Sequence, residues 1–71
     1  MATDPATVQQ PKHPLPALTT FELSEHRRQL ENAIAYYDRL EPVPQARADL
    51  QARLADVIAE QDDRTRLAAH A

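Results

Sequence analysis

The hydrophobic residues between positions 18 and 40 recur at spacings of three, four and seven residues. Residues at these spacings lie on one face of an α-helix. The stripe consists of Leu23, Leu30, Ala33, Ile34, Tyr37 and Leu40. We therefore predict a first helix over about residues 20–40, whose apolar face has to be covered by another part of the molecule.

The residues at both ends of this segment fit a helix of that length. With Thr19 as the N-cap, Glu22 falls at position N3 and completes a capping box, while Leu18 and Leu23 form a hydrophobic staple. At the other end Pro42 cannot continue a helix, and it disfavours the helical conformation of the residue before it.

A second helical pattern follows the proline, over about residues 44–66, with Pro44 suited to the first helical position. Its apolar line contains Val43, Ala46, Leu50, Leu54, Val57 and Gln61, with Ile58 on the shoulder. A short connection makes the two helices antiparallel neighbours. The predicted register pairs Ile34 with Leu50, Leu30 with Leu54 and Leu23 with Gln61. The fold class is therefore all-α: an antiparallel, coiled-coil-like two-helix hairpin over residues 18–66.

Acidic and basic residues on the second helix are spaced so that they can form ion pairs. The predicted i, i+4 pairs are Asp49–Arg53, Glu60–Arg64 and Asp62–Arg66. These pairs would keep the exposed face helical without identifying a partner. Residues 67–71 carry no cap, and we expect them to fray.

The first 17 residues contain four of the six prolines, which rules out a regular helix. We predict a disordered or extended tail with too little apolar surface to contribute to stability. Pro11, Pro14 and Pro16 form a P-x-x-P-x-P run, so the tail is either a spacer or a polyproline-type ligand.

Composition narrows the possible chemistry. The 71-residue chain has no glycine and no cysteine, which excludes phosphate-binding glycine loops, disulfides and thiolate sites. Its formal charge is -3, and no apolar run reaches the length of a membrane span. We expect a cytoplasmic protein, and the abundance of arginine and alanine suggests a bacterial or phage source.

We predict no enzymatic activity, cofactor or metal, because two helices enclose little volume. His26 follows Glu22 at a metal-compatible spacing, but no further ligand is in register. The expected function is a protein-interaction module that self-associates or docks on a larger protein as an accessory, adaptor or regulatory subunit, because each helix leaves part of its apolar surface uncovered.

The residues expected to contact a protein partner or a second copy are Phe21, Arg27, Tyr36, Tyr37 and Ile58. Exposed aromatic side chains often anchor interfaces. Arg27 interrupts the apolar stripe, either as a side chain reaching solvent or as a buried specificity contact. The alternative function is a small nucleic-acid-associated transcriptional regulator that uses Arg27, Arg28 and Arg39, although acidic residues flank these arginines.

Overall fold

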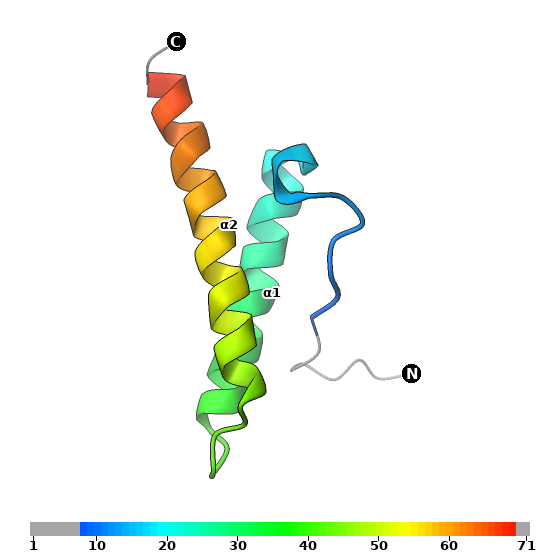
Figure 1. Ribbon diagram of the computed structural model, residues 1–71, viewed down its shortest axis with the longest axis vertical. Helices are drawn as coiled ribbons and strands as arrows, with labels where there is room; N and C mark the ends of the chain where they lie inside the picture. The colour runs from blue at the N-terminus through cyan, green and yellow to red at the C-terminus, as the bar shows by residue number, and fades with distance from the viewer. Residues whose placement is uncertain (1–7, 70–71) are drawn as a thin grey trace.

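The computed structural model describes residues 8–69, which form two long helices and one short helix. The elements are the 3-10 helix η1 (Leu15–Ala17), α1 (Thr20–Asp38) and α2 (Ala46–Ala69). The two α-helices run antiparallel and pack against each other, and α2 extends beyond the start of α1 (Figure 1). This part of the chain contains no strand, and the predicted all-helical hairpin is confirmed.

The N-terminus of α1 has the predicted capping box. The N–H of Glu22 donates to the Thr19 hydroxyl at 3.0 Å, and the N–H of Thr19 donates to the Glu22 carboxylate at 2.9 Å. The main-chain N–H of Thr19, and after it the Thr19 side chain, lower the pKa of the Glu22 carboxyl group. Leu18 and Leu23, the predicted staple, are both buried.

The corner between the helices is longer than predicted. α1 ends at Asp38 instead of residue 40, because the N–H groups of Arg39 and Leu40 bond three residues back in a tightened last turn. α2 begins at Ala46 instead of residue 44, after a similar turn in which the N–H of Arg47 bonds to the carbonyl of Pro44 at 3.1 Å. Within the corner the Glu41–Pro42 peptide is cis.

At its other end α2 continues to Ala69, beyond the expected limit at residue 66. The helices of residues 8–69 include none that is both long enough and apolar enough to cross a membrane.

The core lies along the contact between the two helices. Its buried apolar residues are Leu18, Leu23, Leu30, Ala33, Ile34, Leu50 and Val57. Leu30 is 0% exposed, whereas its predicted partner Leu54 is only partly buried. Leu23 and Gln61, another predicted pair, line the same cavity.

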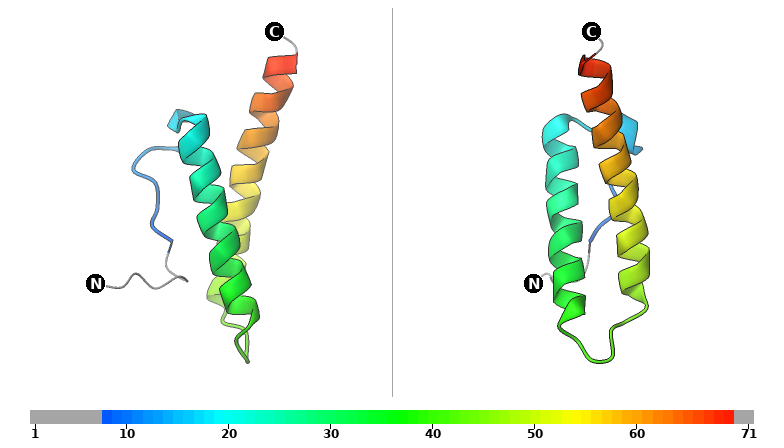
Figure 2. Two further views of the ribbon diagram at one scale, coloured as in Figure 1. Left: turned by 180° about the vertical axis from the view of Figure 1, so that it is seen from behind. Right: turned by 90° about the vertical axis from the view of Figure 1, so that its left-hand side faces the viewer.

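Residues 8–18, which we call the strap, lie across the hairpin. In Figure 2 the strap crosses behind the gap between the helices, from η1 towards the corner. Val8 and Leu15 pack against the core. The expectation of a disordered or extended tail without a stabilising role stays a prediction; at residues 8–17 these two apolar side chains lie against the core, and two arginines of α2 contact the main chain of the strap. Residues 1–7 of the expected tail lie outside the described residues.

Candidate functional site

Arg64 holds the end of the strap that is nearest to α1. Its Nη2 donates to the main-chain carbonyl oxygens of Leu15 at 3.1 Å, Pro16 at 3.4 Å and Leu18 at 2.7 Å. Its Nε donates to the Glu60 carboxylate at 2.9 Å, which confirms one of the predicted ion pairs. The arginine thus satisfies three carbonyls while its own charge is balanced by a neighbour on α2.

Arg53 holds the other end of the strap less completely. Its Nη2 lies 3.3 Å from the carbonyl oxygen of Val8 and 3.5 Å from that of Gln9, both long for hydrogen bonds. Its Nε is buried and has no hydrogen-bond partner among residues 8–69. The predicted Asp49–Arg53 ion pair does not occur among the ion pairs of residues 8–69, because the guanidinium extends towards the strap instead.

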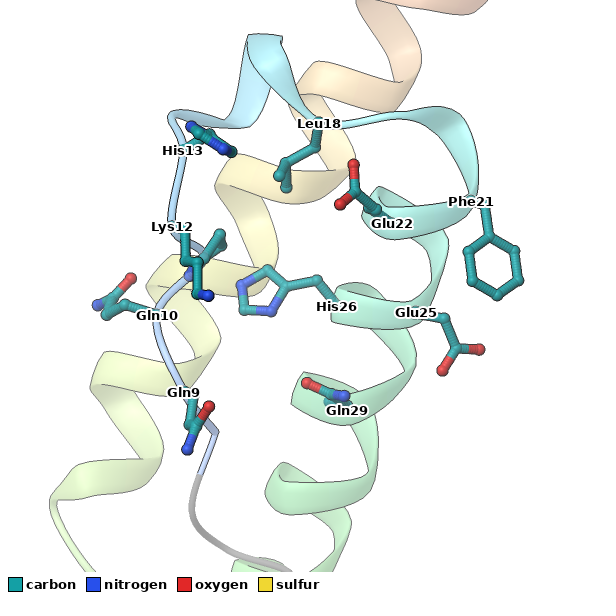
Figure 3. A pocket seen from close by; sticks show the side chains of 11 residues that line it. Gln9, Gln10, Lys12, His13, Leu18, Phe21, Glu22, Glu25, His26 and Gln29 are labelled. Atoms are coloured by element: carbon teal, nitrogen blue, oxygen red, sulfur yellow. The ribbon is translucent and has the colours of Figure 1, made fainter.

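His26 lies beneath the strap and is only 7% exposed. Its ring points from α1 towards Gln10 and Lys12 of the strap (Figure 3). Burial, and then the positive charge of Arg53, lower the pKa of His26, so its neutral form is favoured in the fold. Residues 8–69 include no group of three side chains placed to bind a metal ion.

Two cavities flank the strap. The larger, of about 390 Å³, lies between the strap and α1 (Figure 3). The smaller, of about 140 Å³, lies between the strap and α2. The smaller cavity is lined by Gln10, Pro11, Leu15, His26, Arg53, Asp56 and Val57. The strap therefore lies over the groove between the two helices without filling it.

The aromatic residues predicted to bind a partner occupy different parts of α1. Phe21 is 75% exposed and is one of the residues that line the large cavity, with its ring on the side of α1 away from the strap (Figure 3). Tyr36 is 40% exposed and Tyr37 is partly buried, and their rings pack edge to face with centroids 5.9 Å apart. Tyr36, Tyr37, Leu40 and Val43 lie close together in sequence at the end of α1 and in the corner, and each is exposed or partly exposed; we call these four residues the corner cluster.

The other two predicted contact residues are both partly buried. Arg27 donates from Nη1 to the Gln61 side chain at 2.7 Å, across the two helices, and its Nε lies 3.6 Å from Glu31. Ile58 lies one turn before Gln61 on α2. The structure thus brings Arg27 and Ile58 to neighbouring levels of the hairpin, away from Phe21 and the corner cluster.

Two of the three arginines of the nucleic-acid alternative contact glutamates. Arg28 donates to Glu25 at 2.8 and 3.3 Å, a contact that lowers the pKa of Glu25 and raises the pKa of Arg28. Arg27 pairs with Glu31. Each of these positive charges therefore has a negative charge beside it.

Sequence reasoning missed His26, Arg53 and Arg64 as the residues that meet the strap. One signal was available: His26 lies three residues after Leu23 and four before Leu30, on the buried stripe.

Comparison of this chain with protein-family models, with curated proteins and with solved structures gives no match in any of the three. The fold and its site define a helical hairpin with a strap across the groove between its helices.

Proposed function

We propose that the protein is a non-enzymatic interaction module, a helical hairpin that self-associates or docks on a larger protein as an accessory or regulatory subunit. The observation that carries this proposal is the corner cluster, in which Tyr36, Leu40 and Val43 are exposed and Tyr37 is partly buried. Aromatic side chains in such clusters bind partners with a small loss of conformational entropy.

The size of the core gives a second reason. Its buried side chains come mainly from one stripe on each helix, and a core of this kind contributes only about 3–5 kcal/mol of net stability. Covering the corner cluster with a second copy or with another protein would remove further apolar area from water. Association would then stabilise the hairpin as well as serve its function.

Sedimentation equilibrium over about 1–100 μM, a range that covers typical micromolar affinities, tests self-association. We expect an oligomer that dissociates on dilution and that is weakened by Tyr36→Ser or Leu40→Ser. The matched control is Leu67→Ser, because Leu67 is 71% exposed and lies near the opposite end of the molecule.

Docking on another protein is tested by affinity capture with the wild-type chain and with the Tyr36→Ser variant as baits. A partner that uses the corner cluster is retained by the first and lost by the second. A monomer at every concentration, together with identical capture by both baits, would overturn the proposal.

A further inference from the structure

The groove between α1 and α2 holds the strap through its main chain as well as through the side chains of Val8 and Leu15. Arg53 and Arg64 donate to carbonyl oxygens of the strap, and these contacts do not depend on the side chains of the residues bound. Prolines suit such a segment, because they favour an extended chain whose carbonyls remain free to accept hydrogen bonds. The groove is therefore compatible with other extended, proline-containing segments.

The two arginines differ in how their charge is balanced. Arg64 has Glu60 as an ion-pair partner on its own helix, whereas the ion pairs found in residues 8–69 give Arg53 none. Arg53 also keeps a buried Nε to which the described part of the chain offers no acceptor. A hydrogen bond to a carboxylate is roughly twice as strong as one to a neutral carbonyl, and a carboxylate can accept from two guanidinium nitrogens.

Space for such a carboxylate exists beside Arg53. The cavity of about 140 Å³ under the strap is lined by both Gln10 and Arg53. Asp56 also lines it, but Asp56 is not among the ion-pair partners of Arg53 in the described chain. Gln10 is an exposed residue at this cavity, so an acidic side chain at its position would bring a negative charge to the cavity that the incompletely bonded guanidinium lines.

We propose that this groove is the docking site for an extended, proline-containing, acidic segment of another protein, and that the strap occupies the site until that segment displaces it. The inference rests on the proposed function and names a second surface for it, separate from the corner cluster. The complementary charge of Arg53 identifies the partner as acidic.

Displacement requires the incoming segment to compete with a tethered one. A segment on a short tether has an effective concentration on the order of millimolar, so a free peptide with the strap's own sequence competes poorly. The additional ion pair with Arg53 shifts the balance towards the acidic segment. The strap thereby makes binding selective, because neutral segments are excluded.

Fluorescence anisotropy with two labelled peptides tests the proposal. Both carry the sequence of residues 8–18, one unchanged and one with Gln10→Glu. The protein is the full-length chain, as wild type and as Leu15→Ala, which removes part of the packing of its own strap. We expect the acidic peptide to bind Leu15→Ala about tenfold more tightly than the neutral peptide, the effect of one charge-assisted bond, and to bind the wild type more weakly than Leu15→Ala.

Substitutions at Arg53 show whether the peptide occupies this groove. Adding Arg53→Gln to Leu15→Ala should remove the preference for the acidic peptide, whereas Arg53→Lys should retain part of it. Arg66→Gln is the matched control, because the Arg66 side chain is 70% exposed. Circular dichroism of each variant establishes that the helices are intact.

Equal affinities for the two peptides, an acidic preference that persists in Arg53→Gln, or failure of both peptides to bind Leu15→Ala would each overturn the inference. These results are distinguishable from failure of the proposed function. Association that depends on Tyr36 would survive them, since the corner cluster lies outside the groove.

Discussion

Nη2 of Arg64 lies 2.7 Å from the carbonyl oxygen of Leu18, the residue immediately before the N-cap of α1. A side chain near the end of α2 thus fixes the point at which the strap turns into the hairpin. The same guanidinium pairs with Glu60, so its charge remains balanced inside a partly buried site. The contact joins α2, the strap and the start of α1.

Arg64→Ala should therefore destabilise the whole fold. It leaves the carbonyl of Leu18 without the Arg64 donor and the carbonyl of Leu15 with only the N–H of Leu18, a loss that costs about 1–3 kcal/mol, or a fall in melting temperature of about 5–15 °C in a domain of this size. Thermal denaturation followed by circular dichroism measures it. Arg66→Ala, an exposed neighbour on the same helix, should change the melting temperature by less than about 3 °C.

Removal of the strap separates its contribution from that of the preceding residues. Deleting residues 1–17 should lower the melting temperature, because Val8 and Leu15 lose their packing against the core and the guanidinium groups lose acceptors. The comparison chain, lacking residues 1–7 only, keeps all of these contacts. Identical melting temperatures for the two truncated chains would mean that the strap adds no stability.

Leu30 and Leu54, which the sequence predicts as partners across the hairpin, differ in how deeply they are buried. Leu30→Ala should cost about 2–5 kcal/mol, because Leu30 is fully buried and the substitution leaves a cavity. Leu54→Ala should cost less, since Leu54 is only partly buried. Urea denaturation of both variants gives the difference in the free energy of unfolding. A larger loss for Leu54→Ala would contradict the burial described here.

These two leucines show what the hydrophobic pattern of the sequence predicts and what it does not. The pattern predicts which residues face the other helix, and the capping box at Thr19 and Glu22 is confirmed in detail. It does not predict how deeply each residue is buried, because burial depends on how much of each side chain the rest of the folded chain covers. Leu54 is therefore less buried than its place in the stripe suggests.

Arg53 and Arg64 of α2 show a second limit of prediction from the sequence. The sequence offers Arg53 an acidic residue one turn away, but a long side chain can instead reach a carbonyl distant in sequence, and helical spacing cannot distinguish these outcomes. Arg64 makes both kinds of contact, whereas Arg53 makes only the second. The site under the strap could therefore be found only in three dimensions.

His26 should make stability depend on pH. Its pKa is lowered in the fold below the ordinary value of 6.5, so below about that pH the unfolded chain binds more protons than the folded one. Stability should be fully present above pH 6.5 and should decline as the pH falls below it. The melting temperature between pH 7.5 and 5.5 measures this decline.

The groups that line the two cavities beside His26 determine how specific this test is. Those that can ionise are Glu22 and Glu25 on α1, Lys12 and His13 on the strap, and Arg53 and Asp56 on α2. The two glutamates titrate from an ordinary value of 4.5 downwards, below the window in question. His26→Gln should flatten the dependence above pH 5.5, whereas His13→Gln, at an exposed position, should retain it. A slope that His26→Gln leaves unchanged would assign the effect to another group.

Gln10→Glu within the intact chain should tighten the strap. The new carboxylate brings a negative charge to the cavity that Arg53 lines and forms a charge-assisted bond in a partly buried site. We expect the free energy of unfolding to rise by about 1 kcal/mol, or the melting temperature by about 5 °C, and the gain to shrink at high salt. The control is Gln29→Glu, because Gln29 lines the large cavity but not the one beside Arg53. A gain of equal size in the control would reflect general electrostatics and not this contact.

Tyr36→Ala should separate association from folding. The Tyr36 side chain is 40% exposed on α1 and packs mainly on the edge of Tyr37, so its removal takes little from the core, and the helical circular-dichroism signal should remain. Association should weaken, because truncating an aromatic anchor at an interface costs about 1–4 kcal/mol of binding energy. Leu30→Ala should instead lose its helical signal before any change in assembly is seen. Measuring sedimentation and circular dichroism on the same samples distinguishes the two. If Tyr36→Ala unfolds the chain while its assembly at high concentration persists, then the corner cluster belongs to the core and the partner surface must lie elsewhere on the hairpin.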